Sequence, residues 1–548
     1  MPKIVLTHVT KRWDKFYAVD DLNLVIEDNA FVTLLGPSGC GKTTTLRMIA
    51  GLETPTSGRI TIGDTVVYDS AAGINIPPNK RKVGFLFQNY ALWPNMTVYQ
   101  NISFGLSNVK EALPKYDMEA RKAAALIKAL EKPSEIVKTI EECVDKKGKL
   151  DEKKAQIKLI DRYEISLYGA KELMAANLHK GGDVQAAAAA KRAELEKKLA
   201  DAEKKCAAEG CSFNEDFAYC RDGKPLTVVR KLSKEEIDLS VRRVARIVKI
   251  GMFMDRYPAE LSGGQQQRVA IARTLAPEPS VLFMDEPLSN LDAKLRLEMR
   301  SELQRLHLET GSTFVYVTHD QMEAMTLATK ICLIENGLLQ QYDAPLTVYG
   351  RPNNTFVADF VGNPAINFIE GKGVQKSDGS IDIGILGGIP ANFKPNQPLK
   401  LSDWYAAQAS ADAERKAAEA EKAKQKGYVE KGNKDTLFRH HIALVNETED
   451  FGDEIEAGED DLIIGVRPEF LELREDGPIE GEIYSAMPTG METTVKVQIG
   501  EYLLTGVVFG GVMYELGQKI RFGFRGDDIV LFSKKNGRFI TQGRLDIL

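Results

Sequence analysis

The sequence predicts an α/β domain followed by a smaller all-β domain, and three observations carry this prediction. The apolar run FVTLL at residues 31–35 precedes a glycine-rich segment and then a helical pattern, which is the order strand, loop, helix. A second apolar run, residues 281–284, suits a buried central strand. From about Asn354 onward the pattern changes to short strands and turns.

The glycine-rich segment GPSGCGKTT fits the phosphate-loop pattern GxxxxGKT. In such a loop backbone N–H groups surround the β- and γ-phosphates, Lys42 adds a positive charge, and Thr43 can place its hydroxyl on Mg²⁺. The following TTTLRMIAGL predicts a helix that ends at Gly51 and points its positive dipole end at the phosphates. The expected ATP-binding residues of the loop are Gly36, Ser38, Gly39, Cys40, Gly41, Lys42, Thr43 and Thr44.

Two further segments suit the same chemistry. LSGGQ at residues 261–265 stands directly before a helical pattern that ends near Pro277, so it offers a second set of N–H donors to an anion. Asp285 and Glu286 follow the apolar run of residues 281–284, at the strand end where α/β sheets place ligand-binding residues. Adjacent carboxylates there suit phosphoryl transfer to water, in which positioning and charge matter more than covalent catalysis.

These three motifs in this order resemble the ATP-binding cassette (ABC) ATPases. In that family the LSGGQ loop of one subunit covers the γ-phosphate held by the phosphate loop of the other. The resemblance therefore implies a head-to-tail homodimer, or a pair with a similar ATPase, that holds two ATP molecules and Mg²⁺ at its interface. The residues expected to serve the opposite subunit's ATP are Ser262, Gly263, Gly264 and Gln265, and Asp292 of the SNLDAK segment is expected to cross the interface.

The resemblance also implies individual roles. Glu286 corresponds to the residue that polarises the attacking water, and His319 in VYVTHD to the switch histidine that contacts the γ-phosphate. Gln88 in FLFQNYALWP resembles the Q-loop glutamine, which contacts Mg²⁺ and water beside the surface that touches the membrane subunits. The expected catalytic residues are therefore Glu286, His319 and Gln88, and the expected Mg²⁺ contacts are Thr43, Gln88 and Asp285.

Trp13, in KRWDKFYAVDDL, matches the aromatic position that stacks on adenine in this family. Stacking needs only a π-face, so a tryptophan serves as well as a tyrosine. Phe16 and Tyr17 lie close to Trp13 in the sequence and stay open as alternatives for the base contact.

Length, composition and net charge limit the kinds of partner and compartment that we expect for this chain. A length of 548 residues and 43% hydrophobic residues fit two or three domains, and a net charge of −6 gives no reason to expect a nucleic-acid partner. Six cysteines, one of them Cys40, suggest a reducing compartment. The first residues lack the apolar core of a signal peptide, and no stretch approaches the roughly 18 apolar residues of a spanning helix. If the chain drives transport, separate chains must form the channel.

The stretches after Gln88 and after His319 resemble the ATPase subunits of carbohydrate importers of the maltose and glycerol-phosphate type. This implies an ATPase at the cytoplasmic face of the membrane that drives two integral membrane permease subunits, with an extracytoplasmic solute-binding protein acting indirectly. Importers of polyamine, iron or sulfate share the cassette and stay alternatives. ABC ATPases that act on DNA or ribosomes are a further alternative, although the single phosphate loop and the C-terminal domain favour transport.

The domain boundaries follow from the same resemblance. Residues 1–240 and 241–353 are expected to form the ATPase domain, with a helical insertion at about 107–231 that enlarges its helical subdomain. Residues 354–548 are expected to form a C-terminal all-β barrel of the oligonucleotide-binding (OB-like, TOBE) type, with a charged helix or linker at about 402–440. In that barrel, TTVKVQIG alternates like a half-buried strand, and Asn536-Gly537 predicts a hairpin turn.

The first insertion is rich in Ala, Glu, Lys and Leu, which favours amphipathic helices, and Gly148, Gly169 and Gly181-Gly182 are expected to mark breaks between them. It is either an appendage without chemistry or a partner-contact or regulatory element on the side of the membrane subunits. Its Cys206, Cys211 and Cys220 have long, irregular gaps that favour ordinary thiols over a zinc site. In the second insertion, His440-His441 is expected to be a surface pair.

Overall fold

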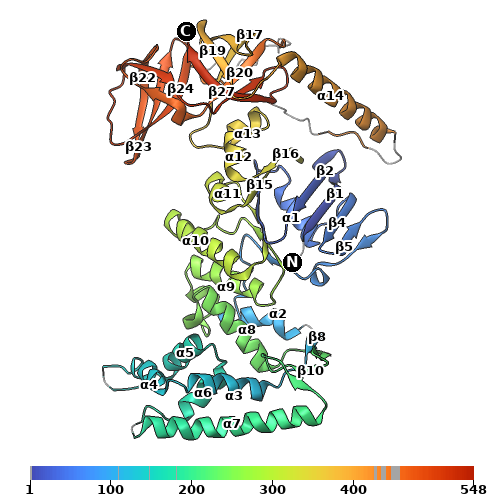
Figure 1. Cartoon of the computed structure of the whole chain (residues 1–548), viewed down its shortest axis with the longest axis vertical. Coiled ribbons are helices and arrows are strands. Elements are labelled where there is room, and N and C mark those ends of the chain that lie inside the picture. The colour runs from blue at the N-terminus through green and yellow to red at the C-terminus, as the bar shows by residue number, and fades with distance from the viewer. Residues whose placement is uncertain are drawn as a thin grey trace. The chain divides into compact units, whose positions relative to one another are not determined.

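The computed structural model of this chain describes residues 3–108, 110–146, 148–180, 182–424, 429–432, 440–445 and 457–548. By its internal contacts the chain divides into two compact units: one is Lys82–Phe314, and the other joins Pro2–Arg81 to Val315–Leu548. The division falls inside strand β14, Thr313–Val317. Figure 1 shows the elements of both units. Within the described residues, none of the helices has the length and apolar character needed to span a bilayer.

The unit that contains the N-terminal residues begins with a five-stranded antiparallel sheet in the order β2-β1-β4-β5-β6. Its strands are β1 (Ile4–Trp13), β2 (Phe16–Ile26), β4 (Ser57–Ile62), β5 (Thr65–Asp69) and β6 (Ile74–Asn75). The fully buried strand β3 (Phe31–Leu35) leads into helix α1 (Lys42–Ala50) and pairs in parallel with β15 (Lys330–Glu335). Strand β16 (Leu338–Asp343) pairs with β15 in the antiparallel direction. The predicted strand, loop and helix are confirmed, because α1 ends at Ala50 with Gly51 as its left-handed cap.

The other unit contains a parallel pair, β7 (Val83–Leu86) and β13 (Val281–Asp285), of which β13 is buried throughout. This unit also contains helices of the expected ATPase domain, namely α2 (Val98–Asn108), α8 (Lys234–Ile247), α9 (Gly263–Leu275) and α10 (Ala293–Thr310). The helix predicted to end near Pro277 is thus α9, and the apolar run of residues 281–284 is a buried strand. Both predictions are confirmed.

Helices of the first insertion belong to the same unit, and Figure 1 shows those in the part of the insertion that the structure describes. They are α3 (Met118–Ala129), α4 (Pro133–Glu141), α5 (Glu152–Tyr163), α6 (Leu167–Ala175) and α7 (Val184–Ala208). These helices have a core of their own, in which Leu126, Ile136, Ile160, Leu173 and Leu195 are buried together. The insertion is therefore a packed subdomain, since isolated helices of this length would be marginal in water.

The structure also has short strands in this insertion that the sequence did not predict. β8 (Glu111–Pro114) pairs with β12 (Thr227–Arg230), so the two ends of the insertion run side by side. A second small sheet contains β9 (Ser212–Phe213), β10 (Tyr219–Arg221) and β11 (Lys224–Pro225). Strand pairs of two to four residues carry too few residues for periodicity to reveal them.

The glycine breaks are correct in two places and wrong in one. Gly148 and Gly182 have left-handed backbones between helices, as predicted, whereas Gly181 lies outside the described residues. Gly169 lies inside α6, so the prediction of a break there is wrong. The chain turns three to five residues earlier, where Glu164 adopts a left-handed conformation and Ser166 caps α6 by accepting a hydrogen bond from the Gly169 N–H.

The other unit resumes within β14, at Val315, and contains the helices α11 (Gln321–Leu327), α12 (Pro345–Gly350) and α13 (Thr355–Phe360). A closed barrel then follows in the strand order β17-β18-β19-β27-β26-β20. Its strands are β17 (Asn367–Gln375), β18 (Ile381–Ile385), β19 (Ile389–Pro395), β20 (Asp461–Val466), β26 (Ile529–Ser533) and β27 (Phe539–Ile547). This closed all-β barrel is consistent with the OB-type domain expected from the sequence, and the hairpin at Asn536-Gly537 is confirmed by the pairing of β26 with β27.

A five-stranded sheet in the order β21-β25-β22-β23-β24 shares its core with the barrel. Its strands are β21 (Leu471–Leu473), β22 (Ile479–Pro488), β23 (Glu492–Ile499), β24 (Tyr502–Phe509) and β25 (Lys519–Phe524). The second insertion starts with the largely exposed helix α14 (Leu401–Ala423), as predicted. The surface pair predicted at His440-His441 is wrong for His440, because its side chain is 13% exposed and its Nε2 lies 2.7 Å from Glu370 Oε1.

Candidate functional site

The phosphate loop connects the buried strand β3 to helix α1. Lys42 is 6% exposed, and its ammonium donates hydrogen bonds to the carbonyl oxygens of Gly36 at 2.8 Å and Pro37 at 2.6 Å. Gly41 has φ 102°, and a side chain at this position would collide with the carbonyl oxygen of Ala18. The loop therefore holds its curvature with the lysine folded across it, and only glycine fits beside the neighbouring strand.

The remaining residues of this loop differ in exposure. Ser38 and Gly39 are exposed at its tip, whereas Thr43 and Thr44 are half-buried in the first turn of α1. The Cys40 thiol is buried, and burial raises its pKa more than the nearby Lys42, whose Nζ lies 3.6 Å from its sulfur, lowers it. Cys40 is therefore a neutral thiol at pH 7 and leaves the positive charge of the loop intact.

Arg81 fixes the far end of the helix that carries Lys42. Its guanidinium donates to the carbonyl oxygens of Met48 at 2.9 Å and Ile49 at 2.8 Å, and its Nε donates to Ile76 at 2.7 Å. Burial lowers the pKa of Arg81 to about 10, so the group stays charged at neutral pH. A cation bound to the last carbonyls of a helix satisfies them and complements the helix dipole. Nothing in the local sequence predicted this contact, because Arg81 lies more than thirty residues after the helix.

Trp13 lies at the end of the β1–β2 hairpin. It is 47% exposed and faces Phe16, which is 48% exposed, across the hairpin, with Lys11 Nζ 5.0 Å from its ring centroid. Tyr17, the other alternative, engages its hydroxyl in a hydrogen bond to the carbonyl oxygen of Val429 at 2.7 Å. Trp13 and Phe16 both present a large exposed ring, as stacking on a base would require.

His319 lies two residues after the end of β14 in an exposed position, within the unit that contains the phosphate loop. The residues around it are tightly fixed: Thr318 and Tyr316 both donate hydroxyl hydrogen bonds to Glu323, at 2.8 and 2.7 Å, and Asp320 caps helix α11. This buried carboxylate holds the strand end and the helix start together. No motif in the sequence pointed to Glu323, although it stands four residues after His319 in a helical pattern.

Asp285, Glu286 and Gln88 belong to the other unit. Asp285 is 5% exposed at the last position of β13, and Glu286 follows it with φ 43°, a left-handed backbone that is unusual for a glutamate. The Gln88 side-chain amide donates to the Glu286 carboxylate at 3.3 Å, and Asn290 donates to the Gln88 carbonyl at 2.9 Å. The structure thus brings together two of the three predicted catalytic residues, as a carboxylate and an amide that could both orient one water molecule.

Arg273 of α9 fixes the segment that follows Gln88. Its guanidinium donates to the carbonyl oxygens of Tyr90 and Ala91, each at 2.6 Å, and lies 5.1 Å from the ring centroid of Trp93. Tyr90 and Ala91 both have positive φ angles, so this turn needs an outside partner for its carbonyl groups. No motif in the sequence pointed to Arg273, which links the helix after LSGGQ to the turn after Gln88.

The LSGGQ segment forms the N-terminus of α9. Ser262 is the N-cap, and its side chain and that of Gln265 exchange hydrogen bonds with each other's backbone N–H groups. Gly263 and Gly264 form the first turn of α9, and Gly264 packs closely against the side chain of Leu295 of α10, which would have to shift to admit a larger residue. Ser262 is exposed, and the N-terminus of the 13-residue helix is a site that favours an anion.

Asp292 caps α10 by accepting a hydrogen bond from the Leu295 N–H at 2.9 Å. Ser289, three residues before Asp292, donates a hydrogen bond from its hydroxyl to the Glu286 carbonyl oxygen, also at 2.9 Å. The segment between the catalytic-site candidate Glu286 and α10 is therefore ordered by its own side chains. Any contact of Asp292 with a second subunit stays a prediction.

The donor set proposed for Mg²⁺ consists of oxygen and amide groups, namely the Thr43 hydroxyl, the Asp285 carboxylate and the Gln88 side chain. Hard oxygen ligands in small number are what Mg²⁺ takes in phosphate-binding sites, where the nucleotide and water supply the rest. The residue types therefore suit the ion. Thr43 belongs to one unit of the chain and Asp285 and Gln88 to the other, so their use as one site stays a prediction. Elsewhere, among the residues that the structure describes, no group of three or more His, Cys, Asp or Glu side chains is arranged to hold a metal, and Cys206, Cys211 and Cys220 are free thiols.

Comparison with known proteins agrees with this arrangement of motifs. A family profile described as "ABC transporter" matches residues 19–160 and 177–289. The trehalose/maltose import ATP-binding protein MalK of Thermococcus litoralis is 35% identical over 384 residues, covering 70% of this chain and 70% of that protein. The xylose/arabinose import ATP-binding protein XacJ of Haloferax volcanii is 37% identical over 372 residues, or 68% of this chain and 64% of that protein.

A third relative is the maltose/maltodextrin import ATP-binding protein MalK of Escherichia coli K12, which is 35% identical over 369 residues, or 67% of this chain and 65% of that protein. Among solved structures, the dimeric bacterial ABC transporter cassette MJ0796 covers 62% of this chain and 98% of its own, with 22% identity and a TM-score of 0.35. The matches to the curated relatives span about two thirds of each relative's length.

The fold and the motifs define an ATPase of the cassette type. With this identity to the MalK proteins over about two thirds of both sequences, the chain belongs to the ATP-binding proteins of the ABC transporter family.

Proposed function

We propose that this chain is the ATP-hydrolysing subunit of an ABC importer for sugars or sugar-like solutes, such as an oligosaccharide or glycerol 3-phosphate. The relatives named for trehalose, maltose, xylose and arabinose import support the solute class. The observation that carries the hydrolytic part is the hydrogen bond of 3.3 Å between Gln88 and Glu286 at the end of β13, because it places an amide and a carboxylate where a water can be oriented.

In this proposal Lys42 and the backbone N–H groups of residues 36–44 hold the phosphates, and one of the exposed rings at the β1–β2 hairpin, Trp13 in the first place, stacks on adenine. When bound, Mg²⁺ neutralises charge on the β- and γ-phosphates, and Thr43, Asp285 and Gln88 are the residues that would hold it. Glu286 accepts a proton from the attacking water, and His319 contacts the γ-phosphate.

The N-terminus of α9, with Ser262 and Gly264, completes the ATP site of a second subunit. Its exposed serine and the N–H groups of its first turn suit a γ-phosphate that arrives from outside the chain. The chain would therefore act as a homodimer, or with a similar ATPase, and Asp292 would lie at the dimer interface. Closure of this dimer around two ATP molecules drives two permease subunits at the cytoplasmic face of the membrane.

In this proposal the ATPase domain covers residues 1–240 and 241–353, and a regulatory barrel covers residues 354–548, as expected from the sequence. The Gln88 segment is the surface through which ATP binding reaches the permeases. Arg273, which binds the two carbonyls after Gln88, supports this path because it ties the Gln88 segment to the helix of the LSGGQ motif.

The test is ATP hydrolysis by the chain co-purified with the permeases encoded beside its gene and reconstituted in vesicles, with candidate sugars and their binding protein added. Stimulation by one sugar together with its binding protein is the expected result. Stimulation by a polyamine, iron or sulfate would replace the solute class and leave the transport role. Stimulation by DNA or ribosomes without any permease would overturn the transport role.

A further inference from the structure

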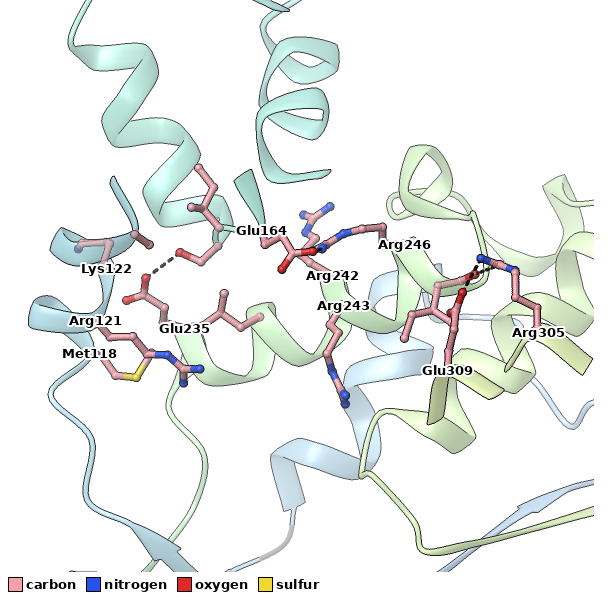
Figure 2. A pocket seen from close by; sticks show the side chains of 15 residues that line it. Met118, Arg121, Lys122, Glu164, Glu235, Arg242, Arg243, Arg246, Arg305 and Glu309 are labelled. Atoms are coloured by element: carbon pink, nitrogen blue, oxygen red, sulfur yellow. Dashed lines mark hydrogen bonds and ion pairs between the residues drawn. The ribbon is translucent and has the colours of Figure 1, made fainter. Parts of the chain in front are cut away.

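A cavity of about 570 Å³ lies between the first insertion and helix α8 (Figure 2). Helix α8 lines it together with α3, the turn between α5 and α6, and the C-terminal end of α10. All of these elements belong to the unit Lys82–Phe314, and none of the ATP-site candidates lines the cavity. A cavity of this size accommodates a small metabolite.

Positive charge predominates on the walls. Six cationic side chains line the cavity against three carboxylates. The cations are Arg121, Lys122, Arg242, Arg243, Arg246 and Arg305, and the carboxylates are Glu164, Glu235 and Glu309. The lining residues thus carry a formal surplus of three positive charges. Five of the six cations, all except Arg246, also pair with a carboxylate outside the cavity lining, such as Glu278, 2.6 Å from Arg243. What the wall offers an anion is therefore the N–H donors that these ion pairs leave unused.

Two guanidinium groups of the cavity wall have an N–H donor that their ion pairs do not use. Arg246 is bound to Glu164 through one terminal nitrogen, and Figure 2 shows the two side chains directed toward each other. Its Nε is buried and has no hydrogen-bond acceptor among the residues that the structure describes, and the same holds for the Nε of Arg305. A guanidinium has five N–H donors in a fork that suits phosphate oxygens, and a buried donor without an acceptor costs free energy. These two arginines would gain from an anion that reaches them.

Other parts of the wall suit the remainder of a sugar phosphate. Glu235 accepts a hydrogen bond of 2.7 Å from the Ser166 hydroxyl, and Glu309 binds Arg305 at 2.9 Å, so carboxylate oxygens stand beside the cations as acceptors for hydroxyl groups. Leu239 and Ile165 supply apolar surface. The wall thus offers cations to a phosphate, carboxylates to hydroxyl groups and apolar side chains to the face of a sugar ring. An inorganic anion would need only the cations.

We propose that this cavity binds a small phosphorylated compound that carries hydroxyl groups, of the sugar phosphate class. Bound there, the ligand contacts α3 and the α5–α6 turn of the insertion on one side and α8 and α10 on the other. It therefore stabilises the attachment of the insertion to the helices of the ATPase domain. This gives the insertion a ligand-binding role that is independent of ATP hydrolysis.

The test is isothermal titration calorimetry of the full chain with fructose 1,6-bisphosphate as the probe, in saturating Mg-ADP so that the phosphate loop is occupied. The wild-type chain should bind the probe and should not bind fructose. In the double variant Arg243→Gln/Arg246→Gln, the probe should bind about tenfold more weakly or not at all. The matched control is Arg192→Gln on the exposed face of α7, which should bind like the wild type.

Hydrogen exchange on the wild-type chain keeps the proposal testable if the double variant unfolds. The probe should slow exchange of backbone amides in α3 and α8, and fructose should not. The proposal is overturned if the wild type shows neither heat nor protection, if fructose acts like the bisphosphate, or if a folded double variant binds the probe as tightly as the wild type. Because no readout depends on ATP hydrolysis, these results are separate from those for the transport proposal.

Discussion

The Tyr17 hydroxyl donates a hydrogen bond to the carbonyl oxygen of Val429 at 2.7 Å, which joins the hairpin of Trp13 to the second insertion. Two neighbouring contacts reinforce it: the Gly432 N–H donates to the Lys15 carbonyl oxygen at 2.8 Å, and Lys431 lies 3.2 Å from Asp20. A segment that begins in the C-terminal domain therefore contacts the hairpin proposed to bind adenine. Both partners belong to the same unit of the chain.

Replacement of Tyr17 by Phe should loosen this contact. The variant keeps the ring and loses one partly buried hydrogen bond, so the free energy of unfolding should fall by about 1 kcal/mol. Urea unfolding monitored by tryptophan fluorescence measures this change. Tyr484→Phe on the exposed face of β22 is the control and should leave stability within about 0.5 kcal/mol of the wild type. Equal stability of Tyr17→Phe and the wild type would show that the hydrogen bond does not contribute.

Glu286→Gln should bind ATP and hydrolyse it at least about 100-fold more slowly, because an amide cannot accept the proton of the attacking water. The variant should accumulate as a closed dimer with ATP. Size-exclusion chromatography with ATP and steady-state phosphate release measure the two effects. The control Glu298→Gln changes an exposed carboxylate on α10 and should hydrolyse ATP normally. Full activity of Glu286→Gln would remove this residue from the role of base.

Arg81→Ala should destabilise the helix behind the phosphate loop. It leaves the carbonyl groups of Met48, Ile49 and Ile76 without their donor, and the expected loss is roughly 3 kcal/mol. Nucleotide affinity should fall as well, since α1 carries Lys42. Thermal unfolding with and without Mg-ATP measures both. In Arg59→Ala, the control, a side chain that is 55% exposed is removed, so little should change. An unchanged melting temperature of Arg81→Ala would contradict the capping role.

Glu370 should make the stability of the barrel depend on acid pH. Burial raises the pKa of this carboxyl, but hydrogen bonds from His440 and Lys534 together outweigh burial and leave the pKa below its ordinary value. The ionised form is thus favoured in the folded chain, so its stabilising effect is complete above the ordinary glutamate pKa of about 4.3 and is lost as the pH falls below it. Urea unfolding of wild type and Glu370→Gln at pH 7, 5 and 3.5 measures this.

The difference in unfolding free energy between wild type and Glu370→Gln should be largest at pH 7 and should shrink at the lowest pH. Glu480→Gln, an exposed carboxylate on β22 that is 79% accessible, should show no such trend. A constant difference between wild type and Glu370→Gln across the three pH values would mean that the cluster of Glu370, His440 and Lys534 does not respond to protonation.

The sequence by itself determined the cassette class, the phosphate loop, the LSGGQ helix and the buried strand before Asp285. Each of these depends on residues that are neighbours in the chain: glycines that free the backbone, a cap directly before its helix, or an apolar run long enough for one strand. Such local signals can be recognised without knowledge of the fold, because the backbone geometry that requires them is itself local.

The tertiary structure alone decided which distant groups satisfy one another. The guanidinium of Arg81 on the end of α1, that of Arg273 on the turn after Gln88, the Tyr17 contact with Val429, and the burial of His440 against Glu370 all join residues separated by tens to hundreds of positions. A buried charge or carbonyl group needs a hydrogen-bond partner, but the neighbouring sequence indicates neither which residue that partner is nor where it lies in the chain. The arginine-rich cavity beside α8 exists for the same reason: four separate segments supply its walls, and only packing brings them together.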